Sequence, residues 1–336
     1  MRKNILILSL IAIVFSNYCF GQFEGGYSSK LWKTYRFDMI FGAGTCFYMG
    51  DIGGGPGEAA HFMGVKDFQF KTTRPTLTLG ARYKILERLA VRTGFTYARL
   101  AADDKNSKET NRQRRNMNFK TNVYELALQL EYSFIKENRG KRYIFQKNSI
   151  INNINLYAFL GVAGFHFNPK AELNGTTYKL QELSTGGQGM TFTDTITGFS
   201  YTGDSPYKLY QLSFPMGLGV KYYLSKHWSL GAELGVRYTT TDYLDDASGR
   251  YFDNATIVAN KGAIAGQLAD PHITWSGSDG SNYPGIDDPA YTPYTNNWIQ
   301  RGDKKYNDAY LFSIITLTYT FTTRARSEFK FAMVQE

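Results

Sequence analysis

The sequence contains four histidines, the residue type most often used as a general base at neutral pH: His61, His166, His227 and His272. None stands at a spacing typical of a zinc site or a protease motif. Only His166 falls at the outer end of a predicted strand, where a surface-facing hydrolase would place its base, and no matched Ser/Glu pair is evident on neighbouring strand ends. We therefore expect no catalytic residue and place the histidines in loops or at an interface.

Two further patterns approach a ligand site without matching one. An acid-rich turn holds Asp242, Asp245, Asp246 and Asp253, and calcium takes several oxygen ligands of this kind. Its spacing differs from that of an EF-hand, so a solvated acidic loop is the alternative, and we expect no metal site. The glycine-rich runs at 53–55 and 186–189 neither precede a helix nor carry the Lys-Ser/Thr of a phosphate-binding loop. They predict flexible loops, and we expect no cofactor.

Composition narrows the class of protein that carries these residues. The 336 residues include 24 Phe, 25 Tyr and 4 Trp, but only 2 Cys and 9 Pro. This composition excludes a collagen, a coiled coil, a disulfide-stapled miniprotein and a disordered chain. After the first 20 positions, no stretch has the roughly 20 consecutive apolar residues of a membrane helix. A β-rich globular domain or an outer-membrane barrel remains.

The N-terminus predicts export. Arg2 and Lys3 precede an apolar stretch, residues 5–15, that is too short to span a membrane, as in a secretory signal peptide. We expect the signal peptide to cover residues 1–22, and its removal lowers the formal net charge from +9 to +7. Cys19 raises the alternative of a lipoprotein anchor, although the residues before it are not the small apolar ones that such sites use. The mature chain then has a single thiol, Cys46, and no internal disulfide.

Apolar and polar residues alternate in several segments, which predicts strands with one apolar face. From Trp228 to Tyr238 the even positions are apolar with an aromatic residue at each end, whereas the odd positions are small or charged. In a membrane barrel, apolar side chains face lipid, aromatic residues lie at both interfaces and polar side chains face the lumen. The same reasoning predicts eight strands in total, at 35–48, 76–83, 89–97, 124–134, 155–167, 210–222, 228–238 and 311–321.

The lengths of the connections support a barrel. Outer-membrane barrels have short periplasmic turns and longer extracellular loops. The predicted long loops are 49–73, 101–120, 168–206 and 243–305, and the tight turns are 84–88 and 224–227. Connection 136–152 is an exception, because it is long and basic for a periplasmic turn. We predict an all-β chain with a transmembrane barrel at 35–321, a periplasmic lead-in at 23–34 and a periplasmic tail at 322–336.

The predicted lumen is charged. Eight strands leave an interior just wide enough for side chains. Because buried charges persist when they are paired, we expect a salt-bridged plug instead of a porin channel. Its charged residues are Arg82, Arg92, Arg237, Glu125, Glu131 and Glu233. Glycines would give room for these long side chains at Gly42, Gly44, Gly80, Gly94, Gly217, Gly219, Gly231 and Gly235.

A basic run lies in the second predicted extracellular loop. Acidic residues are interleaved with it, at Asp103, Asp104 and Glu109. Contact with anionic lipopolysaccharide and simple solvation are both compatible with this pattern. For an exported barrel we expect outer-membrane lipid and lipopolysaccharide as partners, with no nucleic acid and no small-molecule substrate. The run consists of Lys105, Lys108, Arg112, Arg114 and Arg115.

Several segments resemble the PorG family of the Bacteroidota type IX secretion system. The first residues of these segments are RPTL from residue 74, YEL from 124, NPKAE from 168, YKLYQL from 207 and TDYLDD from 241. The resemblance covers roughly residues 36–321. It implies a non-enzymatic outer-membrane β-barrel that attaches the periplasmic ring of the PorK lipoprotein and PorN to the membrane. The family is not defined by catalytic residues. Connection 136–152 and loop 243–305 are long for this pattern, and 15 residues follow Phe321.

Other functions remain open. A structural OmpA-like small barrel with surface or lipopolysaccharide contacts has the same architecture, and a lipid-modifying barrel enzyme would depend on His166. A PorP-type barrel is expected to carry an Asn-Pro-Ala-type motif, which is absent from residues 23–60. Within the PorG interpretation, residues 136–152 and 322–336 are the expected contacts of the ring, because they are basic and on the predicted periplasmic side.

Overall fold

The computed structural model describes residues 30–53, 72–107, 110–135, 137, 153–193, 198, 200–271 and 301–322. The predicted signal peptide, most of connection 136–152 and the tail beyond 322 lie outside the described residues. Within the described ranges, no helix is long and apolar enough to cross a membrane.

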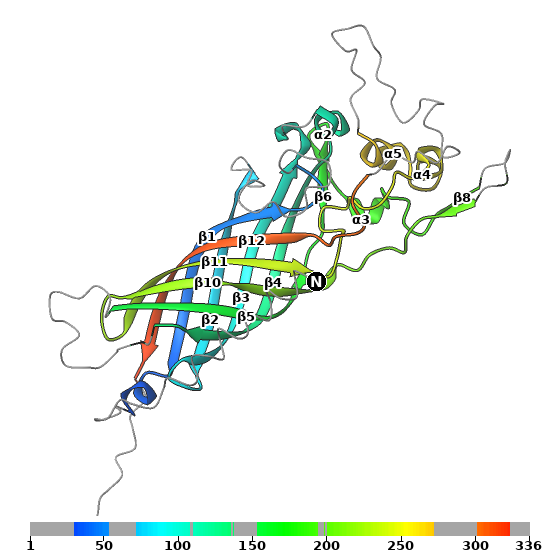
Figure 1. Ribbon diagram of the computed structural model, residues 1–336. Helices are drawn as coiled ribbons and strands as arrows, with labels where there is room; N and C mark the ends of the chain where they lie inside the picture. Colours follow the sequence, from blue (N-terminus) through cyan, green and yellow to red (C-terminus); the bar gives the residue numbers. More distant parts are fainter. Residues whose placement is uncertain are drawn as a thin grey trace, which may run out of the picture.

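Eight long antiparallel strands form a closed barrel (Figure 1). Each strand pairs with the next along the chain, β12 pairs with β1, and the β3–β4 pairing completes the ring. All eight predicted strands are confirmed, with ends shifted by a few residues. The bounds are β1 Phe37–Met49, β2 Arg74–Lys84, β3 Leu89–Asp103, β4 Asn118–Ser133, β5 Ile154–His166, β10 Tyr210–Tyr223, β11 Trp228–Thr239 and β12 Ala309–Phe321.

The alternation in the sequence becomes an inside and an outside. Along β11, Leu230 and Leu234 are exposed on the outer surface, whereas Glu233 and Arg237 are buried in the lumen. Successive side chains of a strand point to opposite faces, so a closed sheet sends every second residue inward. Most polar residues of the strands therefore face the lumen and most apolar residues face outward, but near the loop end the lumen also holds buried apolar side chains such as Phe165 and Phe312.

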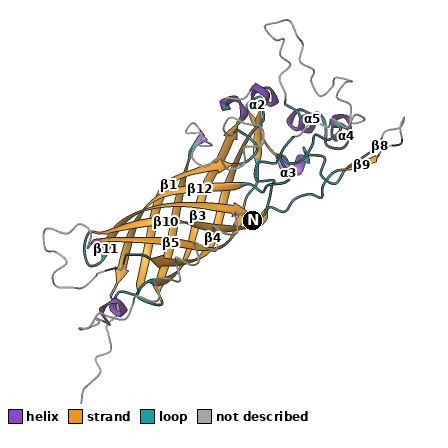
Figure 2. Ribbon diagram, viewed as in Figure 1, coloured by secondary structure: helices purple, strands orange, loops and turns teal. Residues whose placement is uncertain are grey.

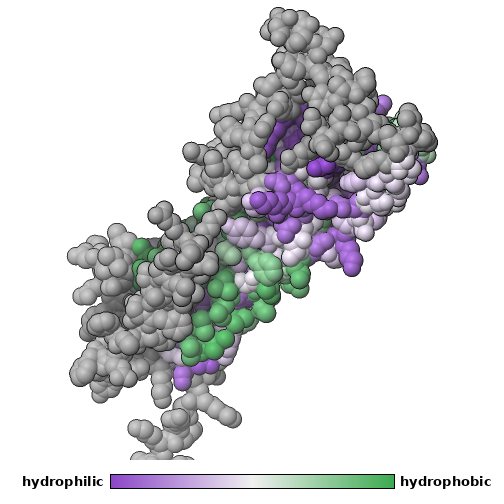
Figure 3. All heavy atoms as spheres, turned by 45° about the vertical axis from the view of Figure 1, so that its right-hand side comes forward, coloured by the Kyte–Doolittle hydropathy of each residue, from purple (hydrophilic) through white to green (hydrophobic). Residues whose placement is uncertain are grey.

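The outer surface is apolar over most of the strand length. Leu126 and Ile315 are 62% and 63% exposed, and Figure 3 shows hydrophobic residues gathered over the strands. An apolar area of this extent is foreign to the water-facing surface of a soluble monomer. Exposed aromatic side chains lie near both edges of the surface, which is the architecture of a small outer-membrane β-barrel. They include Phe37, Tyr83, Trp228 and Phe321 at one edge, and Tyr124, Tyr210 and Tyr238 at the other.

The two ends of the barrel differ (Figure 2). The turn end has the tight connections 85–88 and 224–227, together with the short helix η1 Lys30–Thr34 before β1. The loop end has the long connections, which fold into small elements. These are η4 Asp104–Asn106, α2 Thr110–Arg115, β6 Lys170–Leu173, β7 Thr176–Lys179, α3 Leu180–Leu183, β8 Thr191–Thr193, β9 Ser200–Thr202, α4 Asn254–Lys261 and α5 Ala263–Ala269.

The second long connection is shorter than predicted. Strands β3 and β4 stay paired as far as Asp103 and Asn118, so the connection is 104–117 instead of 101–120. Alternation of apolar residues fades beyond Tyr97, which is why the sequence pattern underestimates the strands. Main-chain pairing continues regardless, because it does not depend on the side chains being apolar.

Candidate functional site

Arg82 of β2 lies at the centre of a charge network in the lumen near the turn end. Its Nε donates to Oδ2 of Asp38 at 2.6 Å, and its other nitrogens lie 3.2 Å from Glu131 and 2.7 Å from Glu137. Lys84 forms an ion pair with the same Glu137. Three strands and the connection after β4 are thereby tied together inside the barrel.

Glu131 of β4 extends this network across the lumen. It lies 3.4 Å from Arg92 and 3.3 Å from Lys221, in addition to its contact with Arg82. Arg92 also lies 2.6 Å from Glu233. The phenol of Tyr157 donates to Oε1 of Glu233 at 2.5 Å, so the same carboxylate oxygen accepts from both Arg92 and Tyr157. Charges deprived of water are stable in this way when each has partners.

A second group of polar residues lies nearer the loop end. Glu125 accepts a hydrogen bond of 2.6 Å from Tyr310 and lies 3.5 Å from Arg237. The guanidinium of Arg237 also stacks over the ring of Phe312, 4.2 Å from its centroid. Aromatic and charged side chains therefore fill this level of the lumen together.

The predicted salt-bridged plug is confirmed, and it is larger than predicted. All six predicted charges are buried and paired. Four charged members of the plug were not predicted from the sequence, namely Asp38, Lys84, Glu137 and Lys221, although Lys221 follows the same alternation and is recognisable from it. Five cations and five carboxylates balance one another: Arg82, Lys84, Arg92, Lys221 and Arg237 with Asp38, Glu125, Glu131, Glu137 and Glu233.

Arg115, at the end of α2, connects the loops at the loop end of the barrel through hydrogen bonds and an ion pair. Its Nε lies 2.8 Å from Oδ2 of Asp104, and its Nη atoms donate to the carbonyl oxygens of Arg301 at 2.8 Å and Asp51 at 2.7 Å. Arg112 donates to the carbonyl oxygen of Gly53. The expectation of a solvated or lipopolysaccharide-binding run is therefore wrong for Arg115, whose largely buried side chain is bound by Asp104 and by backbone carbonyls of neighbouring loops.

Arg301 also connects loops at this end of the barrel. It donates to the carbonyl oxygen of Asp246 and lies 3.3 Å from the carboxylate of the same residue, and it also donates to Thr185 at 3.0 Å. Tyr207 donates to Asp246 at 2.7 Å. We call the loops joined by Arg115 and Arg301 the cap, which comprises the described residues within 50–53, 104–117, 167–209, 240–271 and 301–308.

The acid-rich turn is buried within the cap, which corrects the expectation of a solvated loop. Burial and the nearby carboxylates of Asp51 and Asp245 raise the pKa of Asp242 to about 9. Burial and neighbouring carboxylates likewise raise the pKa of Asp245 and of Asp308. Asp253, which is only partly buried, lies at the start of α4, and its carboxylate caps this helix by accepting from the Thr256 amide at 2.7 Å. Among the described residues, no group of three His, Cys, Asp or Glu side chains has the arrangement of a metal site.

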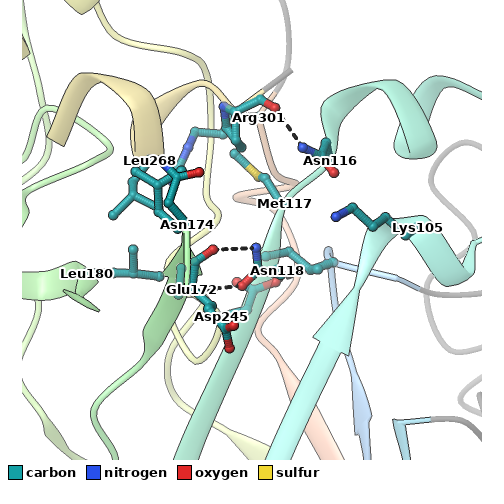
Figure 4. A pocket seen from close by; sticks show the side chains of 14 residues that line it. Lys105, Asn116, Met117, Asn118, Glu172, Asn174, Leu180, Asp245, Leu268 and Arg301 are labelled. Atoms are coloured by element: carbon teal, nitrogen blue, oxygen red, sulfur yellow. Dashed lines mark hydrogen bonds between the residues drawn. The ribbon is translucent and has the colours of Figure 1, made fainter. Parts of the chain in front are cut away.

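A pocket of about 210 Å³ lies in the cap between the start of β4, the β6–β7 hairpin and α5 (Figure 4). Asn118 and Glu172 bond to each other across it, with the Glu172 amide donating to Oδ1 of Asn118 at 2.9 Å. Asn116 donates to the carbonyl oxygen of Pro271 at 2.9 Å. Its polar groups thus hold loops together, and its described lining does not include a nucleophile beside a base.

The described histidines lie at the edges of the barrel. His166 is on the outer face of β5, between the rings of Tyr124 and Tyr210 at centroid distances of 6.3 and 4.7 Å. His227 is at the turn end, with Nδ1 2.9 Å from the carbonyl oxygen of Thr320. Both positions fit the aromatic edge of a membrane barrel. His61 and His272 lie outside the described residues.

Comparison with family models finds one match. Residues 39–192 match a family described as a domain of unknown function, DUF6089. This range runs from β1 into β8. A comparison with curated proteins found no match.

Solved structures that are similar to this chain are outer-membrane or surface proteins. Neisserial surface protein A shares 8% sequence identity, with 85% of this chain and 97% of that chain covered and a TM-score of 0.31. OprG from Pseudomonas aeruginosa shares 10% identity, with 86% and 98% covered and a TM-score of 0.33. Ail of Yersinia pestis shares 7%, with 85% and 97% covered and a TM-score of 0.33. The closure of this barrel is established by its own strand pairing.

Proposed function

We propose that this protein is a non-enzymatic outer-membrane component of the type IX secretion system that anchors the periplasmic PorK/PorN ring. One observation carries the proposal most strongly: the lumen is filled from β2 to β11 by paired charges, with the cap above it. A barrel closed in this way has no path for folded cargo, so its use to a secretion machine is attachment. The resemblance of its segments to the PorG family suggests the type IX secretion system as the assembly and PorK and PorN as the partners.

The proposed orientation puts the turn end in the periplasm. Short turns are periplasmic in outer-membrane barrels, and the connections at 85–88 and 224–227 are short. Strand β4 ends at Ser133 and β12 ends at Phe321, both at the turn end, so connection 136–152 and the tail after 321 leave the barrel on this side. We propose these two basic segments as the contacts of the ring.

Charge reversal tests the ring contact without removing chain. Affinity purification from mild detergent would compare ring recovery by the full-length protein and by a variant with Lys136, Arg139, Lys141, Arg142 and Lys147 changed to Glu. The expected result is loss of PorK and PorN from the variant. A matched control is Lys179→Glu with Lys261→Glu, which changes cations of the loop end and should leave recovery unchanged. Equal recovery by both variants would argue against the proposed contact.

The second candidate is a structural small barrel of the OmpA-like kind with surface or lipopolysaccharide contacts. The folded cap favours it, because hairpins and two helices, α4 and α5, stand beyond the barrel at the loop end (Figure 1). Gene deletion separates the candidates. Loss of type IX cargo from the medium supports the secretion role, whereas intact secretion with an altered cell surface supports the structural one.

A further inference from the structure

An unbroken row of ring side chains crosses the outer face near the loop end. Tyr97, Tyr124, His166 and Tyr210 occupy directly paired positions on β3, β4, β5 and β10. Neighbouring ring centroids in this row are 5.3, 6.3 and 4.7 Å apart. Rings of this kind, with an apolar body and a polar atom, favour the boundary between hydrocarbon and headgroups.

The next paired row towards the turn end has a gap. It reads Phe95, Leu126, Gly164 and Leu212 across the same four strands, so glycine stands where the neighbours have large apolar side chains. The result is an outward-facing groove of about 820 Å³, with Leu126 and Leu212 as walls and the ring of His166 at its upper edge.

Gly164 differs from every other glycine in the eight barrel strands, all of which are described. The other nine face the lumen, where most of them make room for neighbouring atoms. A Cβ atom at Gly164 would meet nothing within 4 Å. Packing inside this protein therefore does not require glycine here, and a glycine inside a strand lowers stability relative to alanine. The groove is available to an occupant from outside the chain.

Cations stand on the polar side of the ring row. Arg99 on β3 is exposed, and its Nε donates to the phenol of Tyr97 at 2.9 Å. Lys208 is exposed two residues before Tyr210. Lys120 is also exposed, and its Nζ lies 3.2 Å from Glu172. From the loop end towards the turn end, the surface thus runs from positive charge to aromatic rings to an apolar groove.

We propose that this groove binds one acyl chain of lipid A, with lipid A phosphates held at Arg99 and at Lys208 above the ring row. The order of charge, rings and groove matches an amphiphile that has an anionic headgroup and a saturated tail in one leaflet. The proposal rests on the proposed orientation, because lipid A occupies the outer leaflet, on the side of the loop end. The occupied groove restores the apolar layer that Gly164 interrupts.

Native mass spectrometry of the full-length protein in detergent tests the site. Purified lipid A would be added to the wild type, to Gly164→Leu, which fills the groove, and to Ala232→Leu, a matched change on the outer face of β11. We expect the fraction carrying lipid A to fall about tenfold in Gly164→Leu and to stay unchanged in Ala232→Leu. Heat-modifiable migration on gels would confirm that each variant is a folded barrel.

Two further arms decide the identity of the occupant. Arg99→Gln with Lys208→Gln should weaken binding of lipid A but leave binding of dephosphorylated lipid A unchanged. Phosphatidylglycerol should bind the wild type and Gly164→Leu equally. Equal lipid A binding by Gly164→Leu and Ala232→Leu would overturn the site. The assignment of lipid A as the occupant would be overturned if Gly164→Leu reduced phosphatidylglycerol binding as much as lipid A binding. It would also be overturned if the wild type formed a dimer that Gly164→Leu abolished. Ring recovery is measured separately, so failure here is distinguishable from failure of the secretion role.

Discussion

Arg92 on β3 and Glu233 on β11 lie four strands apart in either direction around the barrel, yet Nη1 of Arg92 is 2.6 Å from Oε1 of Glu233. Both side chains are buried. The ion pair therefore crosses the lumen and connects opposite walls. Through Glu131 it also joins Arg82 and Lys221, so eight of the ten plug charges form one connected network, and the pair of Glu125 and Arg237 lies beside it nearer the loop end.

We predict that removing one charge of this pair destabilises the barrel strongly. Arg92→Met leaves Glu233 and Glu131 buried with fewer partners, and breaking a buried pair in this way costs about 3–5 kcal/mol. Urea unfolding in detergent micelles would measure the loss. The control, Lys179→Met, breaks a pair with Glu182 whose side chains are about half exposed, and should cost less than about 1 kcal/mol. Losses of equal size would contradict a plug that stabilises through burial.

The filled lumen predicts an impermeable barrel. Eight strands enclose side chains and no aqueous channel, and here the ion pairs cross the interior. Wild-type protein in planar bilayers should show no stable conductance step, and proteoliposomes should not swell in sugar solutions. A reproducible open-channel current from pure protein would contradict this assignment.

Glycine at position 219 is required by the plug. A Cβ atom there would overlap the ring of Tyr157, which cannot move freely because it bonds to Glu233 and lies under the Lys221 ammonium, 4.1 Å from the ring centroid. Gly219→Ala should therefore destabilise by about 1–3 kcal/mol in the same urea assay. Gly94→Ala is the control, because its Cβ atom would meet ordinary contacts from 3.7 Å outwards. It should be neutral or stabilise by up to about 1 kcal/mol; equal losses would argue against a specific clash.

The cap should loosen as the pH rises. Asp242 has its pKa raised to about 9 in the folded cap, against about 3.9 in an unfolded chain. The folded state therefore holds a proton that the opened state releases, so stability present at low pH is lost as the pH rises through this window towards 9. The raised pKa values of Asp245 and Asp308 act in the same direction.

Hydrogen exchange measures this loss directly. The free energy of opening at the Leu244 amide, which donates to Asp308 at 2.9 Å, should fall between pH 6 and pH 9 after correction for intrinsic exchange. Asp242→Asn should flatten the dependence, while amides in the middle of β11 serve as an internal control. A wild-type opening energy that does not change with pH would refute the prediction.

The sequence alone determined the barrel and the contents of its lumen. Alternation is a local property, because successive side chains of a strand point to opposite faces, so Glu131 and Arg92 could be placed inside without knowing which residues they meet. Eight such segments and their alternating connection lengths then fixed the architecture. The same local rule underestimated β3 and β4 where side chains become polar, and it left Asp38 and Lys84 at the strand ends unrecognised.

Only the tertiary structure decided which charged residues pair with each other and how the long loops pack. Arg115 and Asp242 look like solvated loop residues in the sequence, yet they are enclosed by connections that are far apart along the chain. Their environment forms when the strand ends bring those connections together at one end of the barrel. The alternation of apolar and polar residues within a strand does not predict these contacts between distant loops. The gap at Gly164 is likewise visible only once Leu126 and Leu212 stand beside it in register. The periodicity of a strand depends on neighbouring residues in the sequence, whereas burial and pairing of the loop residues depend on closure of the barrel.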